Sequence, residues 1–176
     1  MIRIFLVGYM GAGKTTLGKA LARRMNISYI DTDHFIENRY CKKVGEIFTS
    51  KGEEYFREVE HRVLCEVADF ENIIISTGGG LPCFNNNMDI MNDKGKTVFL
   101  DVSVEELAIR LKTSKTVRPV LKDSAENDLA DFIKESLDKR RPFYEQAKLH
   151  FKAEQMYTER DIEVLAEKLE ALVSDM

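Results

Sequence analysis

The sequence predicts an α/β domain in which helices cover both faces of a parallel β-sheet. Short apolar runs alternate with longer segments of helical periodicity, and this alternation is typical of parallel sheets. The run NIIIS, residues 72–76, is continuous and β-branched, as expected for a strand covered on both faces. We therefore expect a three-layer α/β/α arrangement. Because no linker or repeat interrupts the pattern, residues 1–176 are predicted to form a single domain.

Five short apolar runs are the predicted strands. The first, IRIFLV, leads directly into a glycine-rich loop. The second, SYID, ends at a carboxylate, and the third, NIIIS, is followed by a threonine and three glycines. TVFLDV is the fourth strand and LHFKA is the fifth. These strands cover residues 2–7, 28–31, 72–76, 97–102 and 149–153.

The segments between the strands have the apolar spacing of helices. After the glycine-rich loop, Leu17, Ala20 and Leu21 recur at helical spacing, which predicts a helix from about Lys14 to Met25. Two short helices and a longer one are expected between the second and third strands. The predicted helices cover residues 14–25, 34–40, 44–52, 53–69, 104–112, 127–147 and 161–175.

Composition excludes several classes of protein. The net charge of -4 provides no overall positive field that would attract nucleic acid or an anionic membrane. Three cysteines without a C-x-x-C spacing argue against a structural zinc site or a disulfide framework. The first apolar run is too short for a secretory signal, and no run approaches the roughly 20 apolar residues of a membrane span. We therefore expect a cytoplasmic protein, and the lack of a sustained apolar heptad predicts a monomer.

The stretch GYMGAGKTT, residues 8–16, predicts a phosphate-binding loop. It has the spacing G-x-x-x-x-G-K-[ST], follows a predicted strand and opens a predicted helix, which is the required context. Backbone N–H groups and the positive end of the helix would face the phosphates. Lys14 is expected to bridge the outer phosphates, and the Thr15 hydroxyl is expected to bind Mg²⁺. The predicted nucleotide-binding residues of this loop are Gly11, Ala12, Gly13, Lys14, Thr15 and Thr16.

Carboxylates follow two of the other predicted strands, at the edge of the sheet where ligands gather. Asp31 and Asp33 lie two residues apart, so one can reach the Mg²⁺ shell while the other faces a substrate hydroxyl. Asp33 has an alternative role as the N-cap of the following helix. Asp101 follows the fourth strand, and it either binds a metal or simply begins the next helix.

Glycines and arginines complete the set of candidate residues. The triplet Gly78–Gly80 is either a turn before Pro82 or a loop whose N–H groups bind a substrate carboxylate or hydroxyl. Arg57, Arg118 and Arg140 are either solvated surface charges or partners for carboxylate and phosphate, because the guanidinium fork matches two oxygens at once.

Taken in order, these motifs resemble the shikimate kinase family. The set comprises G-x-M-G-x-G-K-T, D-T-D, GEEYFREVE, TGGG, VRPVL and RRPFYEQA, and it extends from Ile4 to about Ala147. The resemblance implies Mg²⁺-dependent transfer of the ATP γ-phosphate to the 3-hydroxyl of shikimate, in the route to chorismate and the aromatic amino acids. It also implies a nucleoside-kinase-like fold with strand order 2-3-1-4-5, substrate-binding helices at about 33–61 and a mobile lid at about 112–127.

The resemblance also assigns roles to individual residues. Asp33 matches the candidate base that contacts the shikimate hydroxyls, and Asp31 matches a residue of the Mg²⁺ shell. Arg57 and Arg140 match the pair that binds the shikimate carboxylate, and Arg118 matches a catalytic lid arginine that covers the phosphates. Further matches, on the substrate side, are backbone donors at Gly79 and Gly80, apolar walls at Phe48 and Phe56, and a partner of Arg57 at Glu60.

The sequence departs from the usual pattern of the family at two places, and two alternative functions remain open. The lid reads Arg118-Pro119-Val120-Leu121 where the family usually has R-P-L-L, and EQMYTERDI lacks the proline that often packs on adenine. Arg110 is the candidate for stacking on the base. The alternatives are another small-molecule kinase, for gluconate or a nucleotide, and a nucleotide-binding module without catalysis. A nucleotide acceptor would need further base-stacking groups, whereas the arginines and the glycine triplet suit a small carboxylic acid.

Overall fold

Five parallel strands form one sheet in the order β2-β3-β1-β4-β5 in a computed structural model of the chain, which describes residues 2–113 and 126–176. Each neighbouring pair of strands is parallel. The predicted strand order is therefore confirmed, and each predicted strand is present to within a residue or two at its ends. The strands are β1 (Arg3–Val7), β2 (Ser28–Asp31), β3 (Ile73–Ser76), β4 (Lys96–Asp101) and β5 (Leu149–Lys152).

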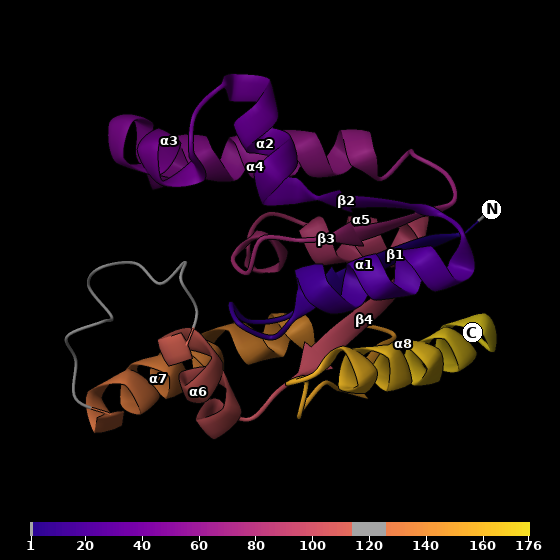
Figure 1. The fold of residues 1–176 in the computed structure, drawn as a ribbon. Coiled ribbons are helices and arrows are strands. Elements are labelled where there is room, and N and C mark those ends of the chain that lie inside the picture. The colour runs from indigo at the N-terminus through magenta and orange to yellow at the C-terminus, as the bar shows by residue number, and fades with distance from the viewer. Residues whose placement is uncertain (1, 114–125) are drawn as a thin grey trace.

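Helices cover both faces of this sheet, as predicted. Figure 1 shows α1 and α8 side by side in front of the sheet, α5 behind it, and α2, α3 and α4 grouped beyond the β2 edge. Within the described residues, no helix is long and apolar enough to cross a membrane. The helices are α1 (Lys14–Met25), α2 (Thr32–Tyr40), α3 (Val44–Lys51), α4 (Glu53–Val67), η1 (Leu81–Cys83, a 3-10 turn), α5 (Asn87–Lys94), α6 (Val104–Thr113), α7 (Glu126–Tyr144) and α8 (Glu159–Ser174).

One helix, α5, is absent from the sequence-based prediction. Its eight residues, NMDIMNDK, include two asparagines and two aspartates, which are poor helix formers. Only Asn87, Met88 and Met91 are buried in it, so the apolar periodicity is too weak to stand out. The chain must nevertheless cross from β3 to a parallel β4, and α5 provides that crossover by packing on β4 and η1.

The register of the central strands places their carboxyl ends in one row. Leu6 of β1 pairs with Ser76 of β3 and with Val98 of β4, and Ser76 pairs in turn with Asp31 of β2. The loops that follow β1, β2 and β3 therefore leave the sheet at the same edge. Parallel sheets bind their ligands at this edge, so the fold itself brings the candidate residues together.

Stability depends on the central strands, which are buried on both faces. Ile75 of β3 is completely buried, whereas Ile109 on α6 is 50% exposed. We predict that Ile75→Ala lowers the free energy of unfolding by about 2–5 kcal/mol, because it leaves a cavity between two layers. The matched control Ile109→Ala should change it by less than about 1 kcal/mol. Urea unfolding followed by circular dichroism measures both, and equal losses would contradict this account of the core.

Candidate active site

The loop between β1 and α1 has the geometry of a phosphate-binding loop. The helix begins at Lys14, as predicted, and its N-cap is Gly13, in the left-handed conformation with a φ of 92°. At this positive φ any residue with a side chain would be strained, so the position favours glycine. The first turn of α1 has no acidic side chain to compete for its N–H groups. This helix end is therefore available to an anion.

Lys14 turns back over the loop. Its Nζ atom donates hydrogen bonds to the carbonyl oxygens of Gly8 at 2.7 Å and Tyr9 at 2.9 Å. Burial lowers the pKa of Lys14 to about 8, although the charges of Asp33 and Asp31 oppose that shift. A bound polyphosphate would supply the negative charge that this partly buried ammonium group lacks.

Thr15 and Asp31 lie together, as the sequence predicts. The Thr15 hydroxyl donates to Asp31 Oδ2 at 2.9 Å, so a hydroxyl and a carboxylate share one position beside the loop. Hard oxygen ligands of this kind suit Mg²⁺, which commonly uses one or two carboxylates together with substrate phosphates. Residues 2–113 and 126–176 contain no group of three or more His, Cys, Asp or Glu that could hold a metal.

Asp31, and not Asp33, caps the helix that follows β2. Its Oδ1 atom accepts from the backbone N–H groups of Asp33 at 3.1 Å and His34 at 3.4 Å. The capping alternative for Asp33 is therefore wrong. Helix α2 begins at Thr32 instead of residue 34, because the strand ends directly at its own cap. Asp33 is left in the first turn of α2 with its carboxylate free of capping.

The carboxylate of Asp33 faces the glycine loop. A Cβ atom on Gly78 would lie 2.6 Å from Asp33 Oδ1. Burial and the neighbouring Asp31 charge raise the pKa of Asp33, while Lys14 opposes the shift. Thr32, which is completely buried, accepts a hydrogen bond from the Gly78 N–H at 2.9 Å and so joins α2 to the glycine loop. The role of Thr32 was not predicted, and its only signal was its place between the two aspartates.

Arg57 is held in a fixed position on α4. Its Nη1 atom donates to Glu60 at 2.6 Å and its Nη2 atom donates to Glu53 at 3.0 Å. The guanidinium carbon lies 4.1 Å from the centre of the Phe84 ring. A Cβ atom on Gly80 would be 2.6 Å from Arg57 Nη1, so this glycine permits the approach of the arginine. Arg57 and Gly80 are thus brought together, as expected of a carboxylate-binding site.

Arg140, on α7, lies beside the same loop. Its guanidinium carbon lies 5.5 Å from the centre of the Tyr9 ring, and its Nη1 atom would be 3.6 Å from a Cβ atom on Gly79. Tyr144, on the same helix, donates a 2.6 Å hydrogen bond to the Gly79 carbonyl. Burial raises the pKa of Tyr144, which keeps its hydroxyl a donor. The position of Tyr144 in RRPFYEQA was the only sequence signal for this anchor.

Glu60 is the buried partner of Arg57. Only 2% of the residue is exposed. Burial raises the pKa of Glu60 to about 7, although the hydrogen bond and the charge of Arg57 act in the opposite direction. The charge of Asp33 adds to the increase. Glu60 thus fixes the position of the Arg57 guanidinium group. The burial that this requires disfavours the charged form of the Glu60 carboxylate.

Two phenylalanines form an aromatic pair between α3 and α4. Phe48 and Phe56 meet edge to face with their ring centres 5.8 Å apart. Phe56 is buried, whereas 38% of Phe48 is exposed. The predicted apolar walls are therefore in contact, and one of them is open to solvent.

Arg110 lies against the phosphate-binding loop. Its Nε atom donates to Glu106 at 2.8 Å, its Nη1 atom to the Ala12 carbonyl at 3.2 Å, and its Nη2 atom to the Ala153 carbonyl at 2.7 Å. Each guanidinium nitrogen thus has an acceptor, and only 14% of the side chain is exposed.

Asp101 has neither of its two predicted roles. Its carboxylate forms ion pairs with Lys152 on β5 and with Arg141 on α7, at 3.4 Å for the latter. Burial raises the pKa of Asp101, but the hydrogen bond and charge of Lys152 and the charge of Arg141 lower it overall. The next helix is capped instead by Ser103, whose hydroxyl accepts from the Glu106 N–H. Asp101 is therefore a structural ion-pair residue.

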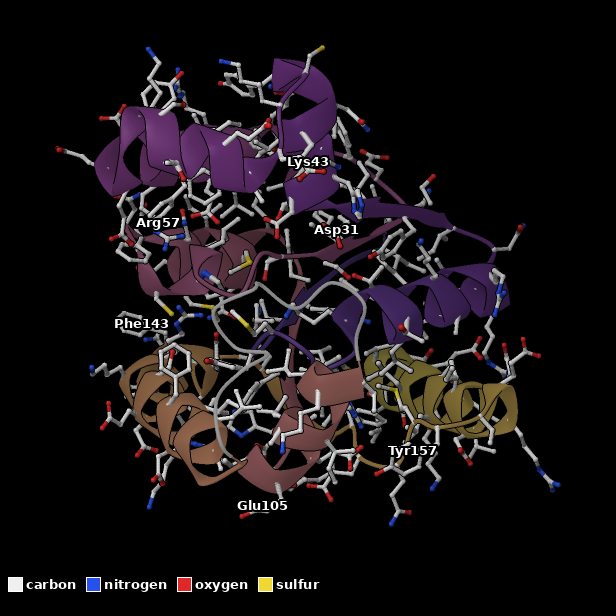
Figure 2. The ribbon with its side chains drawn as sticks, turned by 60° about the vertical axis from the view of Figure 1, so that its left-hand side comes forward. Asp31, Lys43, Arg57, Glu105, Phe143 and Tyr157 are labelled. Atoms are coloured by element: carbon white, nitrogen blue, oxygen red, sulfur yellow. The ribbon has the colours of Figure 1, made fainter. Side chains whose placement is uncertain are left out.

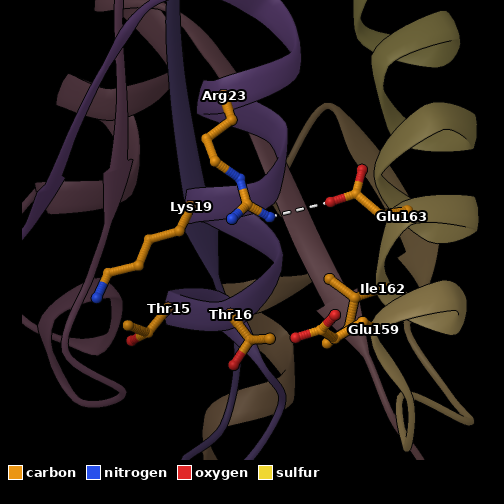
Figure 3. A pocket seen from close by; sticks show the side chains of 7 residues that line it. All are labelled: Thr15, Thr16, Lys19, Arg23, Glu159, Ile162 and Glu163. Atoms are coloured by element: carbon orange, nitrogen blue, oxygen red, sulfur yellow. Dashed lines mark hydrogen bonds and ion pairs between the residues drawn. The ribbon is translucent and has the colours of Figure 1, made fainter.

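A groove of about 550 Å³ opens beside the loop, between α1 and α8. Figure 3 shows Thr15 and Thr16 at one end of it and the ion pair between Arg23 and Glu163, at 2.9 Å, across the other. Its remaining lining residues are Lys19, Glu159 and Ile162. The exposed Thr16 side chain connects this groove with the phosphate-binding loop.

Figure 2 shows the extent of the site. Arg57 and Asp31 lie on the side of α2 and α4, and Tyr157 lies at the opposite end beside α8. Arg118 and most of the predicted lid, about 112–127, lie outside the described residues. The other predicted residues gather along one edge of the sheet.

A family model, relatives and solved structures more than 30% identical to the chain point to the same family. A family model for shikimate kinase matches residues 10–172. A shikimate kinase from Parabacteroides distasonis is 56% identical over 96% of this chain and 98% of its own length. The crystal structure of a shikimate kinase from Bacteroides thetaiotaomicron has a TM-score of 0.95 at 52% identity, over 98% of each chain. A shikimate kinase from Acinetobacter baumannii in complex with shikimate has a TM-score of 0.87 at 31% identity, over 99% of this chain and 94% of that one.

The raised pKa of Glu60 predicts a pH-dependent stability. Between the ordinary glutamate pKa and about 7, the folded state binds a proton that the unfolded state has released, so stability falls as pH rises through this range. The variant Glu60→Gln cannot bind this proton, so it lacks this contribution to the pH dependence of stability. We expect the unfolding free energy of the parent, relative to the variant, to fall by about 2 kcal/mol between pH 5 and pH 8. Denaturant titrations at the two pH values measure it, and a constant difference would mean that Glu60 titrates normally.

Proposed function

The chain belongs to the shikimate kinase family, and from this we propose that its site transfers the γ-phosphate of ATP to the 3-hydroxyl of shikimate, giving shikimate 3-phosphate and ADP. The reaction belongs to the biosynthesis of chorismate and the aromatic amino acids. One observation carries the proposal for this chain. A phosphate-binding loop, a partly buried carboxylate at Asp33 and a glycine loop between Arg57 and Arg140 lie at the same edge of the sheet.

The acceptor would bind through its carboxylate. We assign Arg57 and Arg140 as its partners, because each guanidinium lies beside the glycine loop and each comes from a different helix. The N–H groups of Gly79 and Gly80 would add donors at this point, and Phe48 and Phe56 would wall the apolar side of the ring. Paired arginines bind a planar carboxylate through two oxygens each, which suits a small hydroxy acid better than a nucleotide base.

Asp33 would orient the attacking hydroxyl. The hydroxyl oxygen attacks the γ-phosphorus, the bond to the ADP oxygen breaks, and the proton of the hydroxyl passes along its hydrogen bond to the Asp33 carboxylate. Its burial and its raised pKa suit a group that accepts a proton. Phosphoryl transfer otherwise depends on positioning and charge neutralisation, which Lys14 would provide at the outer phosphates.

The donor end would use the remaining residues. The phosphates would bind residues 11–16, and Thr15 and Asp31 would hold Mg²⁺, which neutralises phosphate charge when it is bound. From the family resemblance we assign Arg118, within the lid at about 112–127, to the γ-phosphate. Arg110 would stack on the base through a face of its guanidinium. We further propose that residues 1–176 act as one kinase domain, as a cytoplasmic monomer that binds no nucleic acid, in line with the net charge of -4.

The test is ADP release from Mg·ATP with purified protein. Shikimate should raise the rate by orders of magnitude, whereas quinate, gluconate and AMP should leave it near the level without acceptor. Chelation of Mg²⁺ should abolish the reaction. Activity with gluconate or AMP in place of shikimate would overturn the acceptor assignment, and ATP binding without any turnover would favour a non-catalytic module.

Replacing Asp33 should separate chemistry from binding. We predict that Asp33→Asn lowers kcat by about 10²–10⁴-fold with a small change in the KM for ATP, because the amide cannot accept the proton. Asp93→Asn, at an exposed position of α5, is the matched control and should retain full activity. Steady-state kinetics decide the matter, and a kcat near that of the parent would remove Asp33 from the mechanism.

Replacing Arg57 should weaken acceptor binding alone. We expect Arg57→Ala to raise the KM for shikimate by about 10–100-fold, since two charge-assisted hydrogen bonds are lost, and to leave the KM for ATP unchanged. Arg62→Ala, at an exposed position of the same helix, serves as the control. An effect on ATP as large as that on shikimate would indicate a general disruption of the site.

A further inference from the structure

A chain of hydrogen bonds extends from the protein surface to the phosphate-binding loop. The Tyr157 hydroxyl, in the segment between β5 and α8, donates to Glu106 Oε2 on α6. The other oxygen of Glu106 accepts from Arg110 Nε at 2.8 Å. Both oxygens of this carboxylate are therefore used, one toward a tyrosine and one toward an arginine.

Arg110 connects Glu106 to the phosphate-binding loop by hydrogen bonds. Its Nη1 atom donates to the carbonyl oxygens of Gly11 at 3.4 Å and Ala12 at 3.2 Å, and its Nη2 atom donates to the Ala153 carbonyl at 2.7 Å. An arginine that bonds the carbonyl oxygens of two successive loop peptides restrains both peptide planes. In a trans peptide the N–H points away from the carbonyl, so the Gly13 N–H points away from Arg110, whereas the Ala12 N–H donates to the Tyr9 carbonyl at 3.2 Å and closes the turn of the loop.

Within this series of hydrogen bonds, the negative charge of Glu106 balances the positive charge of Arg110. Glu106 is 8% exposed, and only 14% of the Arg110 side chain is exposed. Burial favours the neutral form of Glu106, but the hydrogen bonds from Tyr157 and Arg110 lower its pKa overall. The carboxylate therefore stays ionised at neutral pH and orients Arg110 through a charge-assisted bond.

We propose that Tyr157 and Glu106 are positioning residues for ATP: they hold Arg110 against the Gly11 and Ala12 carbonyls and so keep the phosphate-binding loop in its binding conformation. The proposal rests on the proposed function in taking this loop as the ATP site. Tyr157 is 61% exposed, so its ring contributes little to the core and its hydroxyl is the relevant group. Figure 2 places Tyr157 beside α8, at the end of the site remote from Arg57.

The experiment changes one hydrogen-bonding group at a time in the series from Tyr157 to Arg110. Tyr157→Phe should raise the KM for ATP and the dissociation constant of ADP by about three- to ten-fold, and Glu106→Gln should raise both by more, because it removes the charge as well. The KM for shikimate should change by less than two-fold. Tyr40→Phe, at the end of α2, is the matched control and should have no effect.

A double-mutant cycle decides whether Tyr157 acts through Arg110. In an Arg110→Ala background, the further change Tyr157→Phe should have no effect on ADP binding, because the link to the loop is already broken. Additive effects would overturn the proposal, as would an unchanged affinity in Tyr157→Phe alone. Calorimetric titration with ADP needs no acceptor, so it gives a result even if the protein does not phosphorylate shikimate.

Discussion

One carboxylate, Asp31, joins the two halves of the candidate site. Its Oδ2 atom accepts from Thr15 at the start of α1, and its Oδ1 atom caps α2. The two helices that would face the donor and the acceptor are thus fixed to the same side chain, at the end of the same strand. A change in the position of Asp31 would move the predicted metal ligands relative to Asp33. Phosphoryl transfer requires the distance between the metal ligands and Asp33 to be short and constant, and the position of Asp31 sets this distance.

The charges of the candidate site suit a ligand that carries charges of its own. Burial acts on the cation Lys14 and on the acids Asp33 and Glu60 in the same sense, since it favours the neutral form of each. A polyphosphate beside Lys14 would favour its protonated form, whereas Arg57 already has Glu53 and Glu60 as partners. The same desolvation makes these groups expensive for the folded state, and this is a common feature of sites that bind charged substrates.

The two ends of the site are held by different means. At the acceptor end, side chains reach the glycine loop from three helices: Thr32 bonds Gly78, Tyr144 bonds Gly79, and Arg57 contacts Gly80. At the donor end, α6 and the segment after β5 hold the phosphate-binding loop through Arg110. The glycine triplet has no side chains to pack, so it depends on groups supplied from elsewhere in the chain. The phosphate-binding loop also packs through its own buried side chains, Tyr9 and Ala12.

The sequence by itself determined the sheet, its order through the family resemblance, and the residues that gather at its carboxyl edge. Those features depend on local patterns: β-branched runs, a loop with fixed glycine and lysine spacing, and the D-T-D and TGGG motifs. Tertiary structure alone decided which of two aspartates caps α2, that Asp101 forms ion pairs, and that α5 completes the crossover. It also brought Tyr144 to Gly79 and Tyr157 to Glu106, across 65 and 51 positions of the chain. Such partners leave no periodic signal, because the hydrogen bond depends on where two distant segments meet and not on the residues that surround either one.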